Sequence, residues 1–427
     1  MMEESLPAFA EKPPTLLSKL GPGLITGAAD DDPSGIATYS QAGAQFGFGL
    51  LWTVIFTYPL MVGIQIVSAR IGVVTGHGLA TNIRRHYSKT LLYAVVMLLL
   101  LANIINIAAD IAAMGDALRL VIGGPAHVYA IGFGALSAVL QVMIPYTRYV
   151  RILKWMTLAL LAYVVTVFVV RVPWATVAVG LITFPHLPWK AAYVTTIVAV
   201  FGTTISPYLF FWQSSQEVEN LRAIPHARAL KYAPAKAKAS LDRIKVDTYI
   251  GMGFSNAVAF AIMLTFAVTL HLHGITDISS SAQAAEALRP IAGEFAFTLF
   301  SLGIIGTGLL AIPVLAGSAA YAMAGTFEWK NSLQDKPAVA PRFYAIIVLA
   351  TLLGVALIYA PIDPIKALYW SAVINGVVSI PIMAVMLLMA ARHDIMGALT
   401  ISRRLKILGW LCTSVMALAV ACMFALA

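Results

Sequence analysis

The chain has 427 residues, of which 60% are apolar and only 11% are charged, whereas an ordinary soluble domain has about 25% charged residues. Its mean hydropathy is +0.85. A soluble protein of this length needs far more charge to cover its surface, so the composition excludes a cytosolic enzyme, a disulfide scaffold and a disordered regulator. We therefore expect an all-α, polytopic membrane protein with no enzymatic activity.

Long uncharged stretches occupy most of the chain. A helix needs about 20 apolar residues to cross a bilayer. Dividing the stretches at plausible turns predicts eleven membrane-spanning helices, at 20–43, 48–73, 91–118, 126–145, 149–171, 192–217, 246–273, 293–325, 342–361, 364–391 and 407–426. Residues 1–19 are then a tail, and residues 20–427 form one transmembrane domain.

The positions of the basic residues predict the orientation. With the N-terminus inside the cell, the outer connections contain only Arg119, Arg171, Lys190, Arg289 and Lys366 of the 28 Lys and Arg residues. Basic residues favour the cytoplasmic side of a membrane. We therefore expect a multi-pass protein of the cell membrane with a cytoplasmic N-terminus and, because the span number is odd, an external C-terminus. The net charge of +9 reflects this topology and does not indicate nucleic-acid binding.

The first predicted span contains three adjacent aspartates, Asp30, Asp31 and Asp32. Pro33 pushes Asp32 towards an extended backbone, and glycines flank the triplet on both sides. Non-helical backbone at membrane depth is tolerated only where it is buried in protein or lines a cavity. We therefore expect unwound carbonyl groups and a carboxylate to bind a cation here. The alternative is that the aspartates only cap a half-helix at the membrane surface.

A second interruption falls in the sixth predicted span, where Gly202 and Pro207 lie near the middle. By itself this pattern is typical of an ordinary proline kink. However, spans one and six correspond in two five-helix halves, at about 20–171 and 192–391. Paired interruptions in inverted halves indicate a secondary transporter with a site at the membrane midplane. The sequence has no phosphate-binding G-x-x-x-x-G-K-[ST] loop to power a pump, so an ion gradient must supply the energy.

Three segments carry a recognisable pattern: Asp-Pro-Ser-Gly at 32–35, the run from Ala37 to Trp52, and the run from Ala69 to Gly76. Together they resemble the NRAMP family of divalent metal transporters. The resemblance is strong over residues 20–80, and the span pattern agrees with it to the C-terminus. It implies a LeuT-like fold, with two inverted five-helix repeats, an eleventh helix, and breaks in helices one and six.

The same resemblance implies a metal site between spans one and six. The residues that it places at the metal are Asp32, Ala29, Gly35, Thr203 and Ser206. Around them, in a second layer or along the ion pathway, we expect Asp30, Asp31, Asp110, Asn106, Tyr208 and Ala113.

Several positions depart from the family pattern. The first-helix motif of the family is Asp-Pro-Gly-Asn, and Gly35 stands at its Asn position. The sixth-helix motif is Met-Pro-His, which is Ser206-Pro207-Tyr208 here. A third-helix Asp is retained as Asp110, but Ala113 replaces the Glu that follows it in the proton route, and a tenth-helix Gln is replaced by Ala372.

These departures predict the substrate. A thioether favours soft transition metals, whereas oxygen ligands suit Mg²⁺, Ca²⁺ and Mn²⁺. Ser206 removes the soft donor, and Gly35 removes a side-chain oxygen and opens space. Mg²⁺ is usually held by one or two carboxylates and retained waters. The pattern resembles the NRAMP-related magnesium transporters, a branch that carries Mg²⁺ and Mn²⁺ with weak or absent proton coupling. Accordingly, Ala113 cannot titrate, and the phenol of Tyr208 stays neutral near pH 7.

Other interpretations stay open. One is a proton-coupled Mn²⁺/Fe²⁺ symporter of the usual NRAMP type. Another is a carrier of organic substrates on the same fold, although three adjacent aspartates repel anions. A third is a receptor like the plant ethylene-signalling relatives, which would need a soluble output domain. We expect a divalent metal substrate in a lipid bilayer and no cofactor. The oligomeric state is left open, with a monomer as the working expectation.

The third predicted span carries a polar stripe. Asn103, Asn106 and Asp110 are spaced three and four residues apart, which places them on one helix face. The stripe is either a hydrophilic route beside the metal site or a set of hydrogen bonds between helices. The nearby aromatic cluster of the sixth span, Tyr208 and residues 210–212, is expected to pack or gate rather than bind metal.

Overall fold

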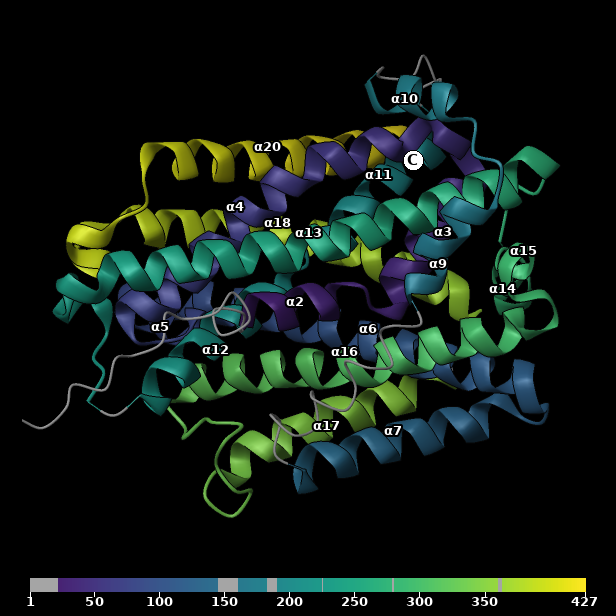
Figure 1. Ribbon diagram of the computed structural model, residues 1–427. Helices are drawn as coiled ribbons and strands as arrows, with labels where there is room; N and C mark the ends of the chain where they lie inside the picture. Colours follow the sequence, from purple (N-terminus) through teal and green to yellow (C-terminus); the bar gives the residue numbers. More distant parts are fainter. Residues whose placement is uncertain (1–21, 145–159, 183–189, 225, 279, 360–362) are drawn as a thin grey trace, which may run out of the picture.

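The computed structural model describes residues 22–144, 160–182, 190–224, 226–278, 280–359 and 363–427, and the regular elements of these ranges are helices (Figure 1). Short 3-10 turns join some of them. The α-helices are α2 (Pro22–Asp30), α3 (Pro33–Phe46), α4 (Leu51–Thr75), α5 (Leu79–His86), α6 (Lys89–Ile122), α7 (Ala126–Met143), α9 (Leu161–Val169), α10 (Trp174–Ile182), α11 (Ala191–Thr204), α12 (Pro207–Ala223), α13 (Ala237–Thr269), α14 (Ser281–Glu286), α15 (Arg289–Ala292), α16 (Ala296–Phe327), α17 (Pro341–Leu357), α18 (Pro364–Ala391), α19 (His393–Met396) and α20 (Arg403–Leu426).

The predicted spans correspond to these helices. The predicted spans at 91–118 and 364–391, for example, are α6 and α18. The predicted tail at 1–19 lies outside the described residues, as does part of the span at 149–171, of which α9 is the described part. Eight described helical stretches are long and apolar enough to cross a membrane, with α17 as a shorter apolar helix. The number is below eleven for three reasons: the first two predicted spans form one stretch, Pro33–Thr75, α17 is counted separately, and only α9 of the fifth predicted span is described.

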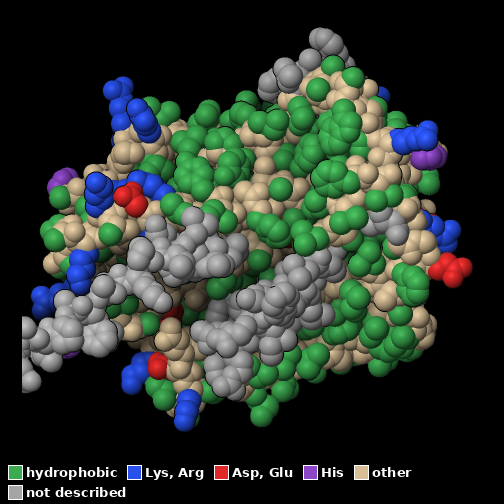
Figure 2. Space-filling model, in the orientation of Figure 1, with side chains coloured by type: hydrophobic (Ala, Val, Ile, Leu, Met, Phe, Trp, Pro, Cys, Tyr) green, Lys and Arg blue, Asp and Glu red, His purple; other side chains and the backbone are tan. Residues whose placement is uncertain are grey.

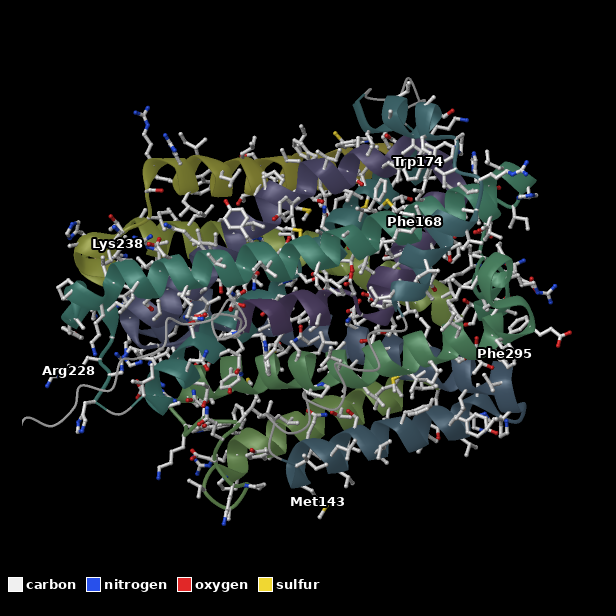
Figure 3. The ribbon with its side chains drawn as sticks, in the orientation of Figure 1. Met143, Phe168, Trp174, Arg228, Lys238 and Phe295 are labelled. Atoms are coloured by element: carbon white, nitrogen blue, oxygen red, sulfur yellow. The ribbon has the colours of Figure 1, made fainter. Side chains whose placement is uncertain are left out.

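The surface is that of a protein surrounded by lipid. Large apolar side chains are exposed along the sides of the bundle, with Phe168 81% and Met143 75% accessible. Figure 2 shows hydrophobic side chains spread widely over the visible face, with charged side chains mainly towards its ends. The labelled residues Arg228 and Lys238 lie at one end of the bundle, and Phe295 lies at the other (Figure 3). This distribution fits a multi-pass membrane protein whose long helices run roughly along one axis.

Small residues let the broken helices approach their neighbours closely. A β-carbon on Gly27 of α2 would overlap the backbone of Gly251 in α13, and one on Gly202 of α11 would overlap the carbonyl of Ala372 in α18. Small residues at helix interfaces allow such backbone contact in membranes. The half-helices α2 and α11 are therefore fixed by backbone packing against α13 and α18, and this packing positions their unwound ends.

Candidate metal site

The first break is the one that the sequence predicts. Helix α2 ends at Asp30, and α3 begins at Pro33. Between them Asp32 is extended (φ −70°, ψ 171°) and caps α3, because its Oδ1 accepts a hydrogen bond from the Gly35 amide at 2.7 Å. Aspartate is a preferred residue at this capping position. The carboxylate is thereby fixed at the positive end of the α3 dipole.

The second break has the same construction. Helix α11 ends at Thr204, and α12 begins at Pro207 after the extended residue Ser206 (φ −81°, ψ 134°). The Ser206 hydroxyl lies within hydrogen-bond distance of the carbonyl oxygens of Gly202 and Thr203, at 2.8 and 2.7 Å. The hydroxyl therefore donates its hydrogen bond to the C-terminal carbonyl groups of α11. The two predicted interruptions are both confirmed as breaks between half-helices.

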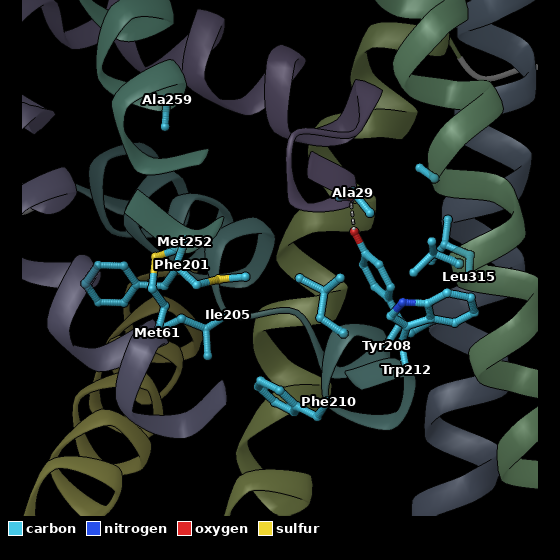
Figure 4. Close-up of a cluster of buried hydrophobic side chains, with 14 of the residues drawn as sticks. Ala29, Met61, Phe201, Ile205, Tyr208, Phe210, Trp212, Met252, Ala259 and Leu315 are labelled. Carbon is cyan, nitrogen blue, oxygen red and sulfur yellow. Dashed lines mark hydrogen bonds between the residues drawn. The ribbon is translucent and has the colours of Figure 1, made fainter. Parts of the chain in front are cut away.

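The two breaks meet in space. The Tyr208 hydroxyl donates to the Ala29 carbonyl at 3.0 Å, a bond drawn in Figure 4, and lies 3.4 Å from Oδ2 of Asp32. A β-carbon on Gly35 would lie 3.2 Å from the Thr203 hydroxyl. The structure thus brings the predicted residues of spans one and six together, and neighbours fill the space expected beside Gly35.

Four neutral donors surround the carboxylate of Asp32, which is 1% exposed. On Oδ1 these are the Ser34 hydroxyl at 2.6 Å and the Gly35 amide. On Oδ2 they are the amide nitrogen of Asn106 at 2.9 Å and the more distant Tyr208 hydroxyl. Hydrogen bonds to a charged group are stronger than those between neutral groups. Asp32 is therefore held from three elements, α3, α6 and α12.

The other acids of the membrane interior have fewer partners. The Ser255 hydroxyl of α13 lies 2.5 Å from Oδ2 of Asp30 and 3.2 Å from Oδ1 of Asp31, and it can donate one hydrogen. The second carboxylate oxygen of each of these aspartates has no hydrogen-bond partner. Both carboxylate oxygens of Asp110 are also without a hydrogen-bond partner. Ala113, one turn after Asp110, is buried. Buried carboxylates without donors are costly, so these positions favour positive charge nearby.

The two asparagines of the polar stripe on α6 have different partners. The Asn103 amide nitrogen lies 2.9 Å from the carbonyl of Leu315 and 2.7 Å from the hydroxyl of Ser318, both on α16. Asn106 instead contacts Asp32. Both asparagines therefore make hydrogen bonds to other helical segments, and the bond of Asn106 lies beside the predicted metal site. Figure 4 shows Phe210 and Trp212 near Tyr208 among the buried apolar side chains, as expected for packing residues.

We call the place where the two breaks meet the crossing. The groups there that could bind a metal are oxygens of carbonyl, hydroxyl, amide and carboxylate groups. Across the residues that the structure describes, no group of three or more His, Cys, Asp or Glu side chains is arranged to hold a metal ion. A cation beside Asp32 would therefore meet one carboxylate and several neutral oxygens. Such ligands suit hard cations such as Mg²⁺, Ca²⁺ and Mn²⁺.

One polar network was not predicted. At the start of α2, the Gly23 amide donates to Oδ2 of Asp247 at 2.8 Å. Arg243, one turn earlier on α13, lies 3.8 Å from that carboxylate and also pairs with Glu217 of α12. We call Glu217, Arg243, Asp247 and Gly23 the inner network. It connects one half-helix of each break, α2 and α12, to α13. The sequence shows only charges near the ends of apolar runs, a pattern too common to reveal it.

Comparison with known proteins gives a consistent result. The chain is 28% identical over 408 residues to a divalent metal cation transporter, MntH, of Klebsiella pneumoniae (strain 342), covering 93% of this chain and 92% of that protein. A second MntH, from Klebsiella pneumoniae subsp. pneumoniae, is 28% identical over 403 residues, covering 92% and 90% of the two chains.

Solved structures show the same fold. A crystal structure of the Eremococcus coleocola manganese transporter matches with a TM-score of 0.74 at 17% identity, covering 98% of this chain and 88% of that one. Mhp1, a nucleobase-cation-symport-1 family transporter, matches with a TM-score of 0.58 at 14% identity over 95% and 92% of the two chains. The predicted LeuT-like fold is confirmed. The family model described as natural resistance-associated macrophage protein-like matches residues 23–426, so the chain belongs to the Nramp family.

Proposed function

We propose that this protein is a secondary transporter that moves divalent metal cations across the membrane by alternating access. The observation that carries the proposal is Asp32, a buried carboxylate on unwound backbone at the crossing of two broken helices, beside the Ala29 carbonyl. Paired broken helices are typical of midplane ion sites. The names of the relatives, divalent metal cation transporter and manganese transporter, support the same class of substrate. We place the metal among Asp32, Ala29, Gly35, Thr203 and Ser206.

The substrates we propose are Mg²⁺ and Mn²⁺. The groups at the crossing that could bind the metal are oxygens, and Ser206 stands where the family motif has a sulfur ligand. Oxygen ligands suit Mg²⁺ and Mn²⁺ and do not favour soft transition metals. A proton-coupled Mn²⁺/Fe²⁺ symporter is the second candidate, and the manganese named for the Eremococcus coleocola relative favours it. The chemistry of Ser206 and Gly35 supports Mg²⁺ as an additional substrate.

We propose that proton coupling is weak or absent. Ala113 stands where the family has the Glu of its proton route, and Tyr208 stands where it has the sixth-helix His. The Tyr208 hydroxyl donates a hydrogen bond to the Ala29 carbonyl. A divalent ion gains about 4.6 kcal/mol at 100 mV, since each charge gains about 2.3. This energy supports roughly thousand-fold accumulation. The membrane potential alone is thus a sufficient driving force.

The remaining parts of the proposal concern architecture. Two inverted repeats, at about 20–171 and 192–391, would rock about the crossing of α2–α3 with α11–α12, and 407–426 would be an additional helix. The end that carries Arg228 and Lys238 would face the cytoplasm (Figure 3). The N-terminus would then be cytoplasmic and the C-terminus external. A single chain contains the whole crossing, which supports a functional monomer.

The test is uptake into proteoliposomes that contain the purified protein and an internal pH dye. We expect Mn²⁺ and Mg²⁺ to enter at an inside-negative potential, with little lumenal acidification per metal ion. Acidification in proportion to metal flux at clamped potential, with no metal-free proton leak, would show a symporter instead. No flux of Mg²⁺, Mn²⁺, Ca²⁺ or Fe²⁺ would overturn the proposal in favour of a receptor or an organic-substrate carrier.

A further inference from the structure

Asn106 brings a side-chain amide to the crossing from a helix that does not take part in either break. It lies in the middle of α6 and is completely buried. Its Nδ2 is 2.9 Å from Oδ2 of Asp32, and its Oδ1 has no hydrogen-bond partner. The amide thus presents one satisfied group and one unsatisfied oxygen beside the carboxylate of the proposed site.

An unsatisfied buried oxygen needs an explanation, since most buried polar atoms have a partner. An Asn amide has a donor end and an acceptor end, which exchange places when the group turns about its last bond. If Asn106 turns, Oδ1 comes close to the carboxylate of Asp32. Two oxygen acceptors next to each other are favourable only when a proton or a cation lies between them. Divalent cations bind amide and carboxylate oxygens at about 2.0–2.6 Å.

Gly35 supplies the complementary observation. It lacks the side-chain oxygen of an Asn at that position, and a β-carbon there would lie 3.2 Å from the Thr203 hydroxyl and 3.4 Å from the Tyr39 ring. The two side chains can shift, but the backbone carbonyl of Asp30 would also lie 3.3 Å away, so a side chain fits here only tightly. The amide missing from α3 therefore has a counterpart on α6, which contacts the same aspartate.

We propose that Asn106 is a ligand of the transported cation, providing an amide oxygen in place of the one that Gly35 lacks. The inference rests on the proposed function, because it requires that the protein bind a divalent cation at Asp32. Asn106 donates to Asp32 when the amide nitrogen faces the carboxylate and binds the cation when the amide oxygen does. The site then has ligands from three helices, and α6 takes part in binding directly.

A ligand and a mere hydrogen-bond donor predict opposite effects of Asn106→Leu. If Asn106 binds the cation, the substitution removes an oxygen ligand, and the Kd for Mn²⁺ and Mg²⁺ rises about tenfold or more, because a polar contact to a charged group is lost. If Asn106 only donates to Asp32, the substitution frees a lone pair of the carboxylate. Cation binding would then be unchanged or tighter.

Asn103→Leu is the matched control. Asn103 lies on the same face of the same helix, is also completely buried and also has an unpartnered Oδ1, but its amide nitrogen bonds to α16. We expect this variant to bind Mn²⁺ with a Kd close to that of the unmodified protein. Rescue by the double variant Asn106→Leu with Gly35→Asn provides a second control, because it returns an amide oxygen from α3.

The experiment is calorimetric titration of the purified full chain with MnCl₂ and with MgCl₂. A raised Kd in Asn106→Leu, an unchanged Kd in Asn103→Leu and recovery in the double variant would support the inference. An unchanged or lower Kd in Asn106→Leu would overturn it. If Asn106→Leu does not fold, Asn106→Asp decides, since a second carboxylate ligand should lower the Kd, and an equal or higher Kd would exclude a ligand role. Failure of the unmodified protein to bind either metal is a different result, which contradicts the proposed function.

Discussion

At the residue scale, Gly35 and Ser206 are the positions that we expect to control metal selectivity. The Ser206 hydroxyl is directed to carbonyls of α11, and a Met there would place a soft sulfur beside the crossing instead. Gly35→Asn would add an oxygen ligand in tight surroundings, since a β-carbon there would lie 3.2 Å from the Thr203 hydroxyl. The double variant Ser206→Met, Gly35→Asn should therefore shift preference from Mg²⁺ towards Mn²⁺, Fe²⁺ or Cd²⁺. Calorimetry on both proteins checks this, and unchanged relative affinities would show that these side chains do not set selectivity.

The sequence predicts the local backbone of the site better than its contacts. The effect of Pro33 on Asp32 and of Pro207 on Ser206 is confined to neighbouring residues, so both extended positions could be predicted. Contacts between helices depend on how each helix is rotated, which apolar sequences specify weakly. The donation from Asn106 to Asp32 and from Ser255 to Asp30 therefore appears only in the structure.

At the scale of elements, the close packing of α2 against α13 depends on Gly27. An added methyl group would overlap the carbonyl of Gly251, and overpacking of this kind costs about 1–3 kcal/mol. Gly27→Ala should lower the temperature at which the protein loses its monodisperse profile in detergent and should reduce metal uptake. Gly132→Ala in α7 is the control, because a β-carbon there meets nothing within 4 Å. It should be neutral or stabilise by up to about 1 kcal/mol. Equal behaviour of the two variants would argue against close backbone packing at α2.

Element boundaries illustrate what hydropathy can and cannot provide. The long helices α6, α16 and α18 lie close to their predicted ranges, because uncharged runs of that length have few alternatives in a membrane. Short connecting helices such as α5 and α10 were not predicted. They are too short to span a bilayer, and packing against neighbouring helices rather than hydropathy decides whether they form.

At the scale of the whole molecule, the inner network joins one half-helix of each break, α2 and α12, to α13. Arg243 is 28% exposed, whereas the side chains of Glu217 and Asp247 are almost completely buried. Arg243→Ala would remove the cation that pairs with both buried acids and should destabilise the protein by up to about 3 kcal/mol. Lys245→Ala, which breaks an exposed pair with Asp242 on the same helix, should cost at most about 1 kcal/mol. Thermal unfolding in detergent compares the variants, and equal losses would mean that the inner network does not hold α2 and α12.

The most direct test of a cation site at the crossing of the broken helices is Mn²⁺ uptake by the Asp32→Asn variant in proteoliposomes. Asparagine keeps the size of the side chain and removes its charge, so the variant should fold and reconstitute normally but lose nearly all uptake of Mn²⁺ and of Mg²⁺. Asp242→Asn, an exposed acid on α13, should transport at the rate of the unmodified protein. Uptake by Asp32→Asn at the unmodified rate, with equal amounts of protein in the vesicles, would show that the transported metal does not bind at Asp32.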